Sequence, residues 1–176
     1  MTNDPIPLNL PPMKGDPNLY KVLMSLDISW KYLEHPAAPT VDEAVKYWKD
    51  LDATHCKNLF FRNHKGNRHY LVILDHRQEL NIRDLEQRLG QGKLTFASPE
   101  RLMKYLGLTP GSVTPFGLIN DHAKQVHLFI DKNLALSKNI SFHPCINTAS
   151  LAIKYSDLLK FLNHCGNTYE YVEMYD

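Results

Sequence analysis

Three short stretches of this chain carry side chains that could bind or activate a substrate. They are residues 56–61 (Cys-Lys-Asn-Leu-Phe-Phe), 111–117 (Gly-Ser-Val-Thr-Pro-Phe-Gly) and 142–148 (Phe-His-Pro-Cys-Ile-Asn-Thr). The first places an ammonium and an amide inside what its pattern predicts to be a buried strand. The second is a turn rich in glycine and proline, and the third sets a histidine just past an apolar strand. Together they indicate one site.

Lys57 is the most informative residue of the three stretches. Side chains alternate between the two faces of a strand, so Lys57 shares a face with Leu59 and Phe61. A lysine on an apolar face is costly to desolvate, and it snorkels or finds a partner. Two interpretations are open. The lysine either protects an edge strand from edge-to-edge pairing, or it is a pocket-facing cation beside Asn58, whose amide both donates and accepts hydrogen bonds.

The loop and the histidine also allow a structural and a functional interpretation. Residues 109–111 (Thr-Pro-Gly) are a turn signal, and most such loops only connect elements. A Gly-x-x-x-Pro loop from Gly111 to Pro115 can instead present backbone N–H groups to a carbonyl oxygen or an oxyanion. His143 is either a structural histidine beside a proline-fixed bend or a group that contacts substrate.

Composition places the chain among ordinary globular proteins. Its 176 residues favour one domain spanning residues 1–176, in which residues 1–13, with four prolines, form an extended arm. Twenty Lys and Arg stand against 19 Asp and Glu, a net charge of +1, which excludes a broad basic field. Any contact with nucleic acid is therefore expected to be local, because each neutralised phosphate needs its own cation.

Cysteine and histidine spacings give no sign of a metal site. The three cysteines are scattered without a Cys-x-x-Cys pair, and the nine histidines show no ligand-like pattern. We therefore expect free thiols in a reducing compartment and no bound metal. No apolar run approaches 18 residues, and the N-terminus lacks a basic segment followed by an apolar one. These features predict a soluble cytoplasmic protein without membrane contact.

Helix and strand signals alternate along the chain and predict a mixed α/β or α+β fold. Expected helices begin at a proline, a capping residue or a capping box (Thr40 with Glu43) and lie at residues 17–26, 41–48, 80–89, 100–106 and 157–164, the last capped by Ser156. Expected strands lie at residues 28–33, 56–62, 70–74, 126–130, 140–142, 151–153 and 169–172, with a hairpin turn at 65–67 and the last strand at an edge.

Four motifs, taken in order, carry a family resemblance. They are residues 57–60 (Lys-Asn-Leu-Phe), 98–102 (Ser-Pro-Glu-Arg-Leu), 111–117 with Asn120-Asp121, and 142–144 (Phe-His-Pro) with Asn147-Thr148. In this order they resemble the YbaK/prolyl-tRNA synthetase-associated editing-domain family. The resemblance is greatest to its freestanding alanyl-tRNA(Pro) deacylases, the ProX/PrdX-like branch, and it covers roughly residues 16–173.

The resemblance implies a mixed, partly barrel-like sheet flanked by helices, and an aminoacyl-tRNA hydrolase that works in trans. Prolyl-tRNA synthetase mischarges tRNA(Pro) with smaller amino acids, and family members hydrolyse the wrong ester without a metal, a cofactor or a classical protein nucleophile. Ala-tRNA(Pro) is then the expected substrate, bound by its acceptor end, and prolyl-tRNA synthetase is an expected transient partner. The alternatives are a deacylase for Ser- or Cys-tRNA and a non-catalytic module that binds tRNA or the synthetase.

The resemblance also assigns roles to individual residues. By motif, the residues expected at the reacting centre are Lys57, Asn58, Gly111 and His143. Those expected to bind substrate are Val41, Val45, Ser112, Val113, Thr114, Pro115 and Asn147, with the two valines as size gates on the helix that walls the pocket.

Overall fold

The computed structural model describes residues 13–37 and 41–176, apart from the side chain of Val41. The expected arm at residues 1–13 falls almost entirely outside the described residues. Thr40 of the expected capping box does so as well.

Local signals set the ends of most helices. In α1 (Pro17–Ser25) the Asp16 carboxylate accepts a hydrogen bond from the N–H of Asn18, and proline occupies the first turn. Helices α3 (Ile82–Leu89) and α4 (Pro99–Leu106) are capped in the same way by Asn81 and Ser98. Helices α2 (Val41–Trp48) and α5 (Tyr155–Cys165) complete the set. These α-helices are close to the predicted ranges.

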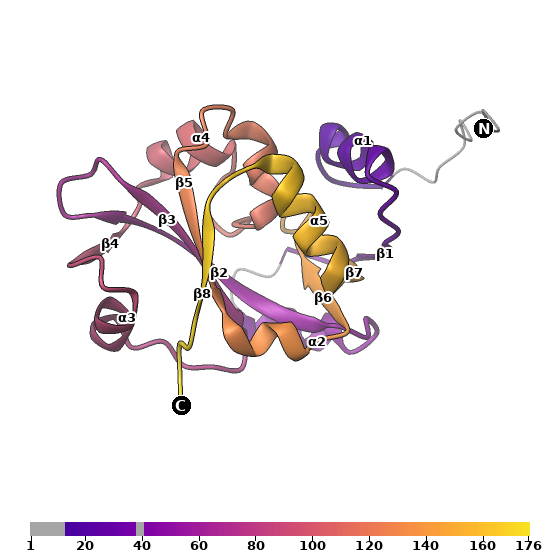
Figure 1. Ribbon diagram of the computed structural model, residues 1–176. Coiled ribbons are helices and arrows are strands. Elements are labelled where there is room, and N and C mark those ends of the chain that lie inside the picture. Colours follow the sequence, from indigo (N-terminus) through magenta and orange to yellow (C-terminus); the bar gives the residue numbers. More distant parts are fainter. Residues whose placement is uncertain (1–12, 38–40) are drawn as a thin grey trace.

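Eight strands form one mixed sheet, in the order β1-β7-β6-β2-β3-β5-β8, with β4 paired to β2 off this path (Figure 1). Their bounds are β1 Lys31–Glu34, β2 Thr54–Asn63, β3 His69–Asp75, β4 Leu94–Phe96, β5 Val126–Asp131, β6 Asn139–Phe142, β7 Ala149–Lys154 and β8 Tyr169–Val172. The β2–β3 hairpin is antiparallel, whereas β6 joins β2 and β5 joins β3 in parallel. The predicted mixed sheet flanked by helices is confirmed, and so is the terminal position of the last strand.

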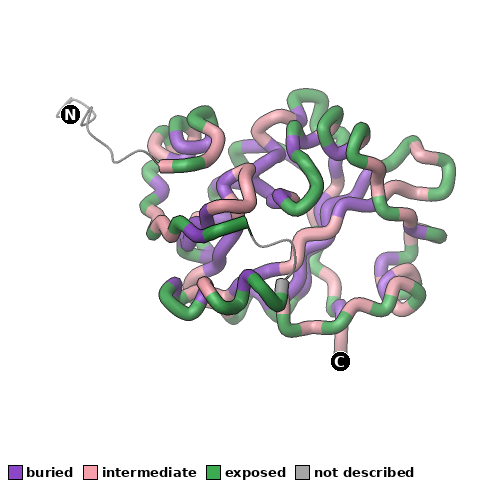
Figure 2. Tube along the Cα trace, turned by 180° about the vertical axis from the view of Figure 1, so that it is seen from behind, coloured by how far each residue is buried: buried purple, intermediate pink, exposed green. Residues whose placement is uncertain are grey.

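The two faces of the sheet bury separate cores. Leu71 and Ile73 of β3 face the larger core, to which α1, α4 and α5 also contribute side chains. Their neighbours Tyr70 and Val72 face the smaller core together with Leu85 of α3. Figure 2 shows the buried stretches running along the strands and the exposed ones along loops and outer helix surfaces. The alternation of β2 and β3 thus decides which residues lie on each face.

Two predictions of local structure were wrong, and three short elements were missed. The first strand begins at Lys31, because Ile28 lies in the turn after α1, where its N–H donates to the carbonyl of Leu23. Helix α5 starts at Tyr155, and its N-terminus has no side-chain cap, so Ser156 does not cap it. The short strand β4 and two 3₁₀ helices, η1 (Pro115–Asn120) and η2 (Lys132–Leu136), were not predicted.

In the part of the chain that the structure describes, no helix has the length and apolar content needed to span a membrane.

Candidate active site

Strand β2 lacks a strand partner on one side at the Lys-Asn motif, a gap in the pairing that we call the opening in β2. On one side β3 pairs with it from Cys56 to Arg62. On the other side β6 pairs only at Thr54 and His55, and β4 pairs only from Phe61 onward. Among the described residues, no strand therefore lies beside residues 56–59 on that side. The interpretation of β2 as an edge strand is wrong, since β2 has neighbours on both sides in the sheet, although residues 56–59 have a strand partner on one side only.

Lys57 and Asn58 leave β2 on opposite faces. Lys57 lies on the face whose Leu59 and Phe61 pack against the smaller core, as the alternation predicted. Its Nζ atom donates to the carbonyl oxygen of Gln78 at 2.5 Å. The ammonium therefore has a partner of neutral charge and lies half-buried beside the end of β3.

Asn58 lies on the face of the larger core, between Cys56 and Phe60. Its Oδ1 atom is buried and accepts no hydrogen bond within the described structure. A buried amide oxygen without a donor is costly, which makes this atom a candidate ligand for a substrate group that donates.

The loop at residues 111–115 is held by its own buried side chains. Gly111 has φ +86°, a backbone conformation that favours glycine, and the N–H of Ser112 closes a turn on the carbonyl of Thr109. The hydroxyl of Thr114 accepts from the N–H of Phe116 and so caps η1. Ser112, Thr114 and Pro115 are all buried. These three side chains support the loop from within.

Three backbone N–H groups of the same loop have no partner in the described structure. They belong to Gly111, Val113 and Thr114. Neighbouring N–H groups on a short, braced loop can stabilise an oxyanion. Of these three residues, Gly111 is exposed to solvent and Val113 is partly exposed, whereas Thr114 is fully buried. The oxyanion role of this loop stays a prediction.

The third motif lies beside this loop. A β-carbon placed on Gly111 would lie 3.5 Å from Nδ2 of Asn147. The rings of Phe116 and Phe142 are 5.6 Å apart at their centroids, nearly perpendicular to each other. The structure thus brings Gly111, Asn147 and the strand end that carries His143 into one region. No hydrogen bond, ion pair or ring contact joins Lys57 to this group in the described structure.

His143 has a defined tautomer. Its Nδ1 atom lies 2.8 Å from the carbonyl oxygen of Ala149, and because a carbonyl only accepts, Nδ1 carries the proton. Nε2 therefore has a lone pair, and no described group donates to it. Burial lowers the pKa of His143, and the nearby ring of His35 lowers it further. The neutral ring at neutral pH can accept a proton from water or from a substrate hydroxyl.

Two residues near this centre were missed by sequence reasoning. His35 is buried, its Nε2 lies 2.9 Å from the Ser150 hydroxyl, and its ring centroid is 5.9 Å from that of His143. Tyr47 of α2 stacks on His35 at 5.7 Å. The contacts of His35 with His143 and Ser150 link segments more than a hundred residues apart, so no spacing in the sequence indicates them. His35 and Tyr47 together connect α2 to His143.

Val45, one of the two valines predicted as size gates, lies on a different face of α2 from Tyr47. Val45 is 43% exposed and lines a hollow of about 360 Å³ together with Trp48, His55 and His76. The rings of Trp48 and His55 stack at 4.4 Å, and burial lowers the pKa of His55 to about 4. The side chain of Val41 lies outside the described part. Both valines stay predictions as gates.

The thiols are unsuited to act as nucleophiles. Cys56, Cys145 and Cys165 are free, and burial raises the pKa of each, that of Cys145 and of Cys165 to about 12. Thiolates are the reactive form, so these groups stay inert near neutral pH. Among the residues that the structure describes, no three His, Cys, Asp or Glu lie close enough together to hold a metal ion.

Comparison with known proteins identifies the class that this fold and site define. Residues 35–161 match the model of the aminoacyl-tRNA editing domain family, which is most of the chain, and the protein belongs to that family. The predicted family is thereby confirmed, together with the predicted enzyme class, an aminoacyl-tRNA deacylase.

Individual relatives are similar over most of their own length. The chain is 39% identical over 152 residues to the prolyl-tRNA editing protein ProX of Acetoanaerobium sticklandii, covering 86% of this chain and 93% of that protein. It is 33% identical to prolyl-tRNA synthetase associated domain-containing protein 1 of Danio rerio, covering 85% and 82%. A solved structure assigned as a candidate trans-editing enzyme for prolyl-tRNA synthetase has a TM-score of 0.64 at 22% identity, covering 90% and 98%. That structure supports the fold alone.

Proposed function

We propose that this protein acts in trans to hydrolyse the ester of mischarged tRNA(Pro), with Ala-tRNA(Pro) as its preferred substrate. The observation that carries the proposal is the braced loop at residues 111–115, whose free N–H groups lie beside Asn147 and the strand end of His143. The identity to a prolyl-tRNA editing protein supports the choice of tRNA(Pro). The proposed place of action is the cytoplasm, with prolyl-tRNA synthetase as a transient partner.

The proposed reaction is the attack of one water molecule on the ester carbonyl. Nε2 of His143 accepts a proton from this water, directly or through a hydroxyl of the terminal ribose, while the loop N–H groups bind the developing oxyanion. Collapse of the tetrahedral intermediate breaks the bond to the ribose oxygen, which takes the proton back from the imidazolium. The products are the free amino acid and a tRNA with its terminal hydroxyl restored.

Two side chains hold the substrate in this proposal. The unpaired Oδ1 of Asn58 accepts a hydrogen bond from the α-ammonium of the aminoacyl group. The ammonium of Lys57 leaves the opposite face of β2, and in this proposal it neutralises a phosphate of the terminal nucleotides and does not contact the ester. Removing one oxyanion donor from such a site costs about 2.7–4 kcal/mol, so the loop supplies the largest single contribution.

The identity of the amino acid is tested by a deacylation panel. Purified protein would be incubated, in buffer containing EDTA, with tRNA(Pro) charged with Ala, Ser, Cys or Pro and with the cognate tRNAs of Ala, Ser and Cys. We expect the highest kcat/KM on Ala-tRNA(Pro), undiminished by EDTA. Faster hydrolysis of Ser- or Cys-tRNA would replace the proposed substrate, and a folded protein without any hydrolysis would identify a binding module.

Activity is expected to depend on the neutral form of His143. Because burial lowers its pKa below the usual 6.5, kcat/KM should be constant above that pH and fall tenfold per pH unit below the lowered pKa. The variant His143→Asn should lose most activity, and its remaining kcat/KM should no longer fall at low pH (the acid limb of the pH profile). A variant that keeps both the rate and the limb would show that another group accepts the proton.

Stability must be followed over the same pH range. A histidine with a lowered pKa binds its proton more readily in the unfolded chain, so its contribution is complete above pH 6.5 and falls with decreasing pH. The same sign holds for His55 and His69, which burial places at a pKa of about 4. Thermal melting at each pH therefore separates loss of fold from loss of catalysis.

Proline must be excluded from the site while alanine enters, so specificity is expected to depend on a size filter. A methylene changes affinity by only about 1–3 kcal/mol, which is the reason for editing. Val45→Ala should raise kcat/KM on Pro-tRNA(Pro) relative to Ala-tRNA(Pro), at little cost in stability because Val45 is 43% exposed. Met103→Ala, an apolar side chain on α4 with 51% exposure, is the matched control. An unchanged ratio in a folded Val45 variant would place the filter elsewhere.

A further inference from the structure

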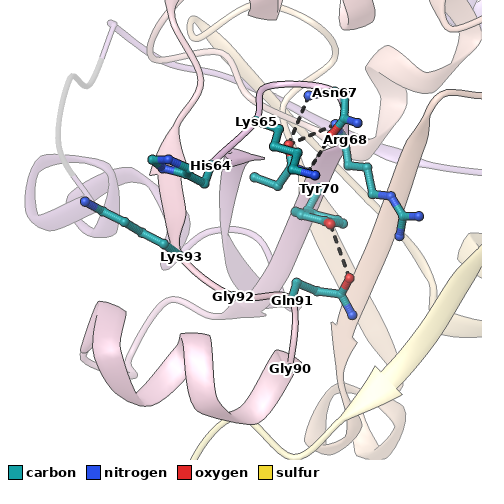
Figure 3. A pocket seen from close by; sticks show the side chains of 10 residues that line it. His64, Lys65, Asn67, Arg68, Tyr70, Gly90, Gln91, Gly92 and Lys93 are labelled. Carbon is teal, nitrogen blue, oxygen red and sulfur yellow. Dashed lines mark hydrogen bonds between the residues drawn. The ribbon is translucent and has the colours of Figure 1, made fainter.

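A second hollow lies at the tip of the β2–β3 hairpin, on the opposite end of β2 from Thr54. It has a volume of about 450 Å³ and lies between the hairpin turn and the loop that follows α3 (Figure 3). Figure 3 shows the side chains of His64, Lys65 and Arg68 leaving the hairpin and that of Lys93 leaving the facing loop. The lining residues are Asn63, His64, Lys65, Asn67, Arg68, Tyr70, Gly90, Gln91, Gly92 and Lys93.

We call this hollow the hairpin pocket. Its charged side chains are all positive. Its lining holds two lysines, one arginine and one histidine, with no aspartate or glutamate. In the described structure, no carboxylate pairs with Lys65, Arg68 or Lys93, and all three are exposed. Since the whole chain carries 20 basic against 19 acidic side chains, this is a local concentration of unneutralised positive charge.

The hairpin turn is rigidly built. The Oδ1 atom of Asn63 accepts from the N–H groups of Asn67 and Arg68, and its Nδ2 donates to Oδ1 of Asn67 at 2.7 Å. From the far side, Nη1 of Arg101 in α4 donates to the carbonyl of Gly66 at 2.8 Å. The cations are thus presented by a backbone that is already ordered, which lowers the entropic cost of binding.

The opposite wall of the pocket is open. Gly90 and Gly92 both have positive φ, and a β-carbon placed on either would meet nothing within 4 Å. The ring of Tyr70 forms the base, but it is 3% exposed and its hydroxyl donates to Gln91 at 3.2 Å. The pocket therefore offers cations and space, and its one tyrosine has no exposed ring face on which a base could stack.

The hairpin pocket and Lys57 lie on the same face of the sheet. Opposed residues of an antiparallel pair project to the same side, and Lys57 opposes Leu74 while Phe61 opposes Tyr70. From Lys57 to Asn63 the strand rises about 20 Å, at roughly 3.3 Å per residue. Lys57 and the hairpin pocket are therefore two sites of positive charge on one face of the sheet, separated along the direction of β2.

We propose that the hairpin pocket binds backbone phosphates of the double-stranded acceptor stem of the tRNA. This inference rests on the proposed function, in which the terminal nucleotides occupy the site near Lys57. At the roughly 3.4 Å per nucleotide of a stacked strand, about 20 Å corresponds to about six nucleotides of the RNA backbone. Lysine and arginine side chains bind backbone phosphates independently of sequence, so this contact positions the RNA and does not select it.

The test measures binding of deacylated tRNA(Pro) by fluorescence anisotropy over a range of salt concentrations. The variant Lys65→Ala/Arg68→Ala/Lys93→Ala should bind roughly tenfold or more weakly, and its slope of log K against log salt should be shallower by about 2 to 3. The control is Lys21→Ala/Lys132→Ala/Lys138→Ala, which removes the same charge from exposed positions elsewhere. The control triple should bind tRNA(Pro) with a Kd within about twofold of the wild-type value, because its lysines lie outside the hairpin pocket.

A charge-conserving variant keeps the result interpretable. Lys65→Arg/Arg68→Lys/Lys93→Arg retains three cations and should retain most of the affinity and the salt slope, whatever the alanine variant does to the fold. Equal weakening by the control triple, or an unchanged salt slope in the pocket triple, would overturn the proposal. Because the probe is uncharged tRNA, pocket-dependent binding together with no hydrolysis of any ester would remove the proposed enzyme function and leave this inference standing.

Discussion

Lys57→Ala is expected to lower kcat/KM for Ala-tRNA(Pro) by roughly 10- to 150-fold, the equivalent of about 1.5–3 kcal/mol for a lost hydrogen bond to a charged group. The reason is that the ammonium lies beside the opening in β2 and has only the neutral carbonyl of Gln78 as a partner. Single-turnover deacylation of Ala-tRNA(Pro), compared with the wild type, measures the effect.

Stability separates this effect from a structural one. Alanine leaves the carbonyl of Gln78 without its donor, at a cost of about 0.5–1.5 kcal/mol in the free energy of unfolding. Lys57→Gln is the matched control, since its amide can still donate to that carbonyl but carries no charge. We expect the glutamine variant to melt near the wild type and to be as slow as the alanine variant. A glutamine variant with wild-type activity would show that the charge of Lys57 has no part in the reaction.

Asn58→Leu is expected to lose activity without losing stability. Oδ1 of Asn58 is buried and unpaired in the described structure, so replacing the amide by an apolar group of similar size removes a desolvation penalty. The melting temperature should stay the same or rise. The substrate ammonium would then lack its acceptor, and kcat/KM should fall by roughly 10- to 150-fold, the effect of one charged hydrogen bond.

The comparison for Asn58 uses a residue on the same strand face. Phe60 is buried beside it in the larger core, and Phe60→Leu should lower the melting temperature through lost packing while leaving kcat/KM nearly unchanged. Opposite signs in the two measurements are the signature of a residue kept for function. If Asn58→Leu melts well below the wild type at full activity, Asn58 has a structural role.

Local sequence signals were sufficient for the parts of the fold that depend on neighbouring residues. Asp16, Asn81 and Ser98 cap their helices, and the alternation along β2 assigned Lys57 to its face. Each of these follows from a few consecutive residues and a fixed period. The family motifs added the order of the three site stretches.

Features that depend on distant pairing were beyond the sequence. The opening beside residues 56–59 exists because β6 and β4 reach β2 only at its two ends. The contact of His35 with His143 and Tyr47 likewise joins separate segments. The hairpin pocket needs the loop after α3 to face the hairpin turn. The net charge of the whole chain also gives no sign of the pocket, since a sum over all residues does not show where positive side chains gather.

The central claim is tested most directly by the hydrolysis of Ala-tRNA(Pro) and Pro-tRNA(Pro), measured side by side with the same purified protein. We expect rapid release of alanine from tRNA(Pro) and a far smaller kcat/KM for release of proline, because the site excludes the larger ring. Equal rates on both esters, or hydrolysis of neither by a folded sample, would contradict it.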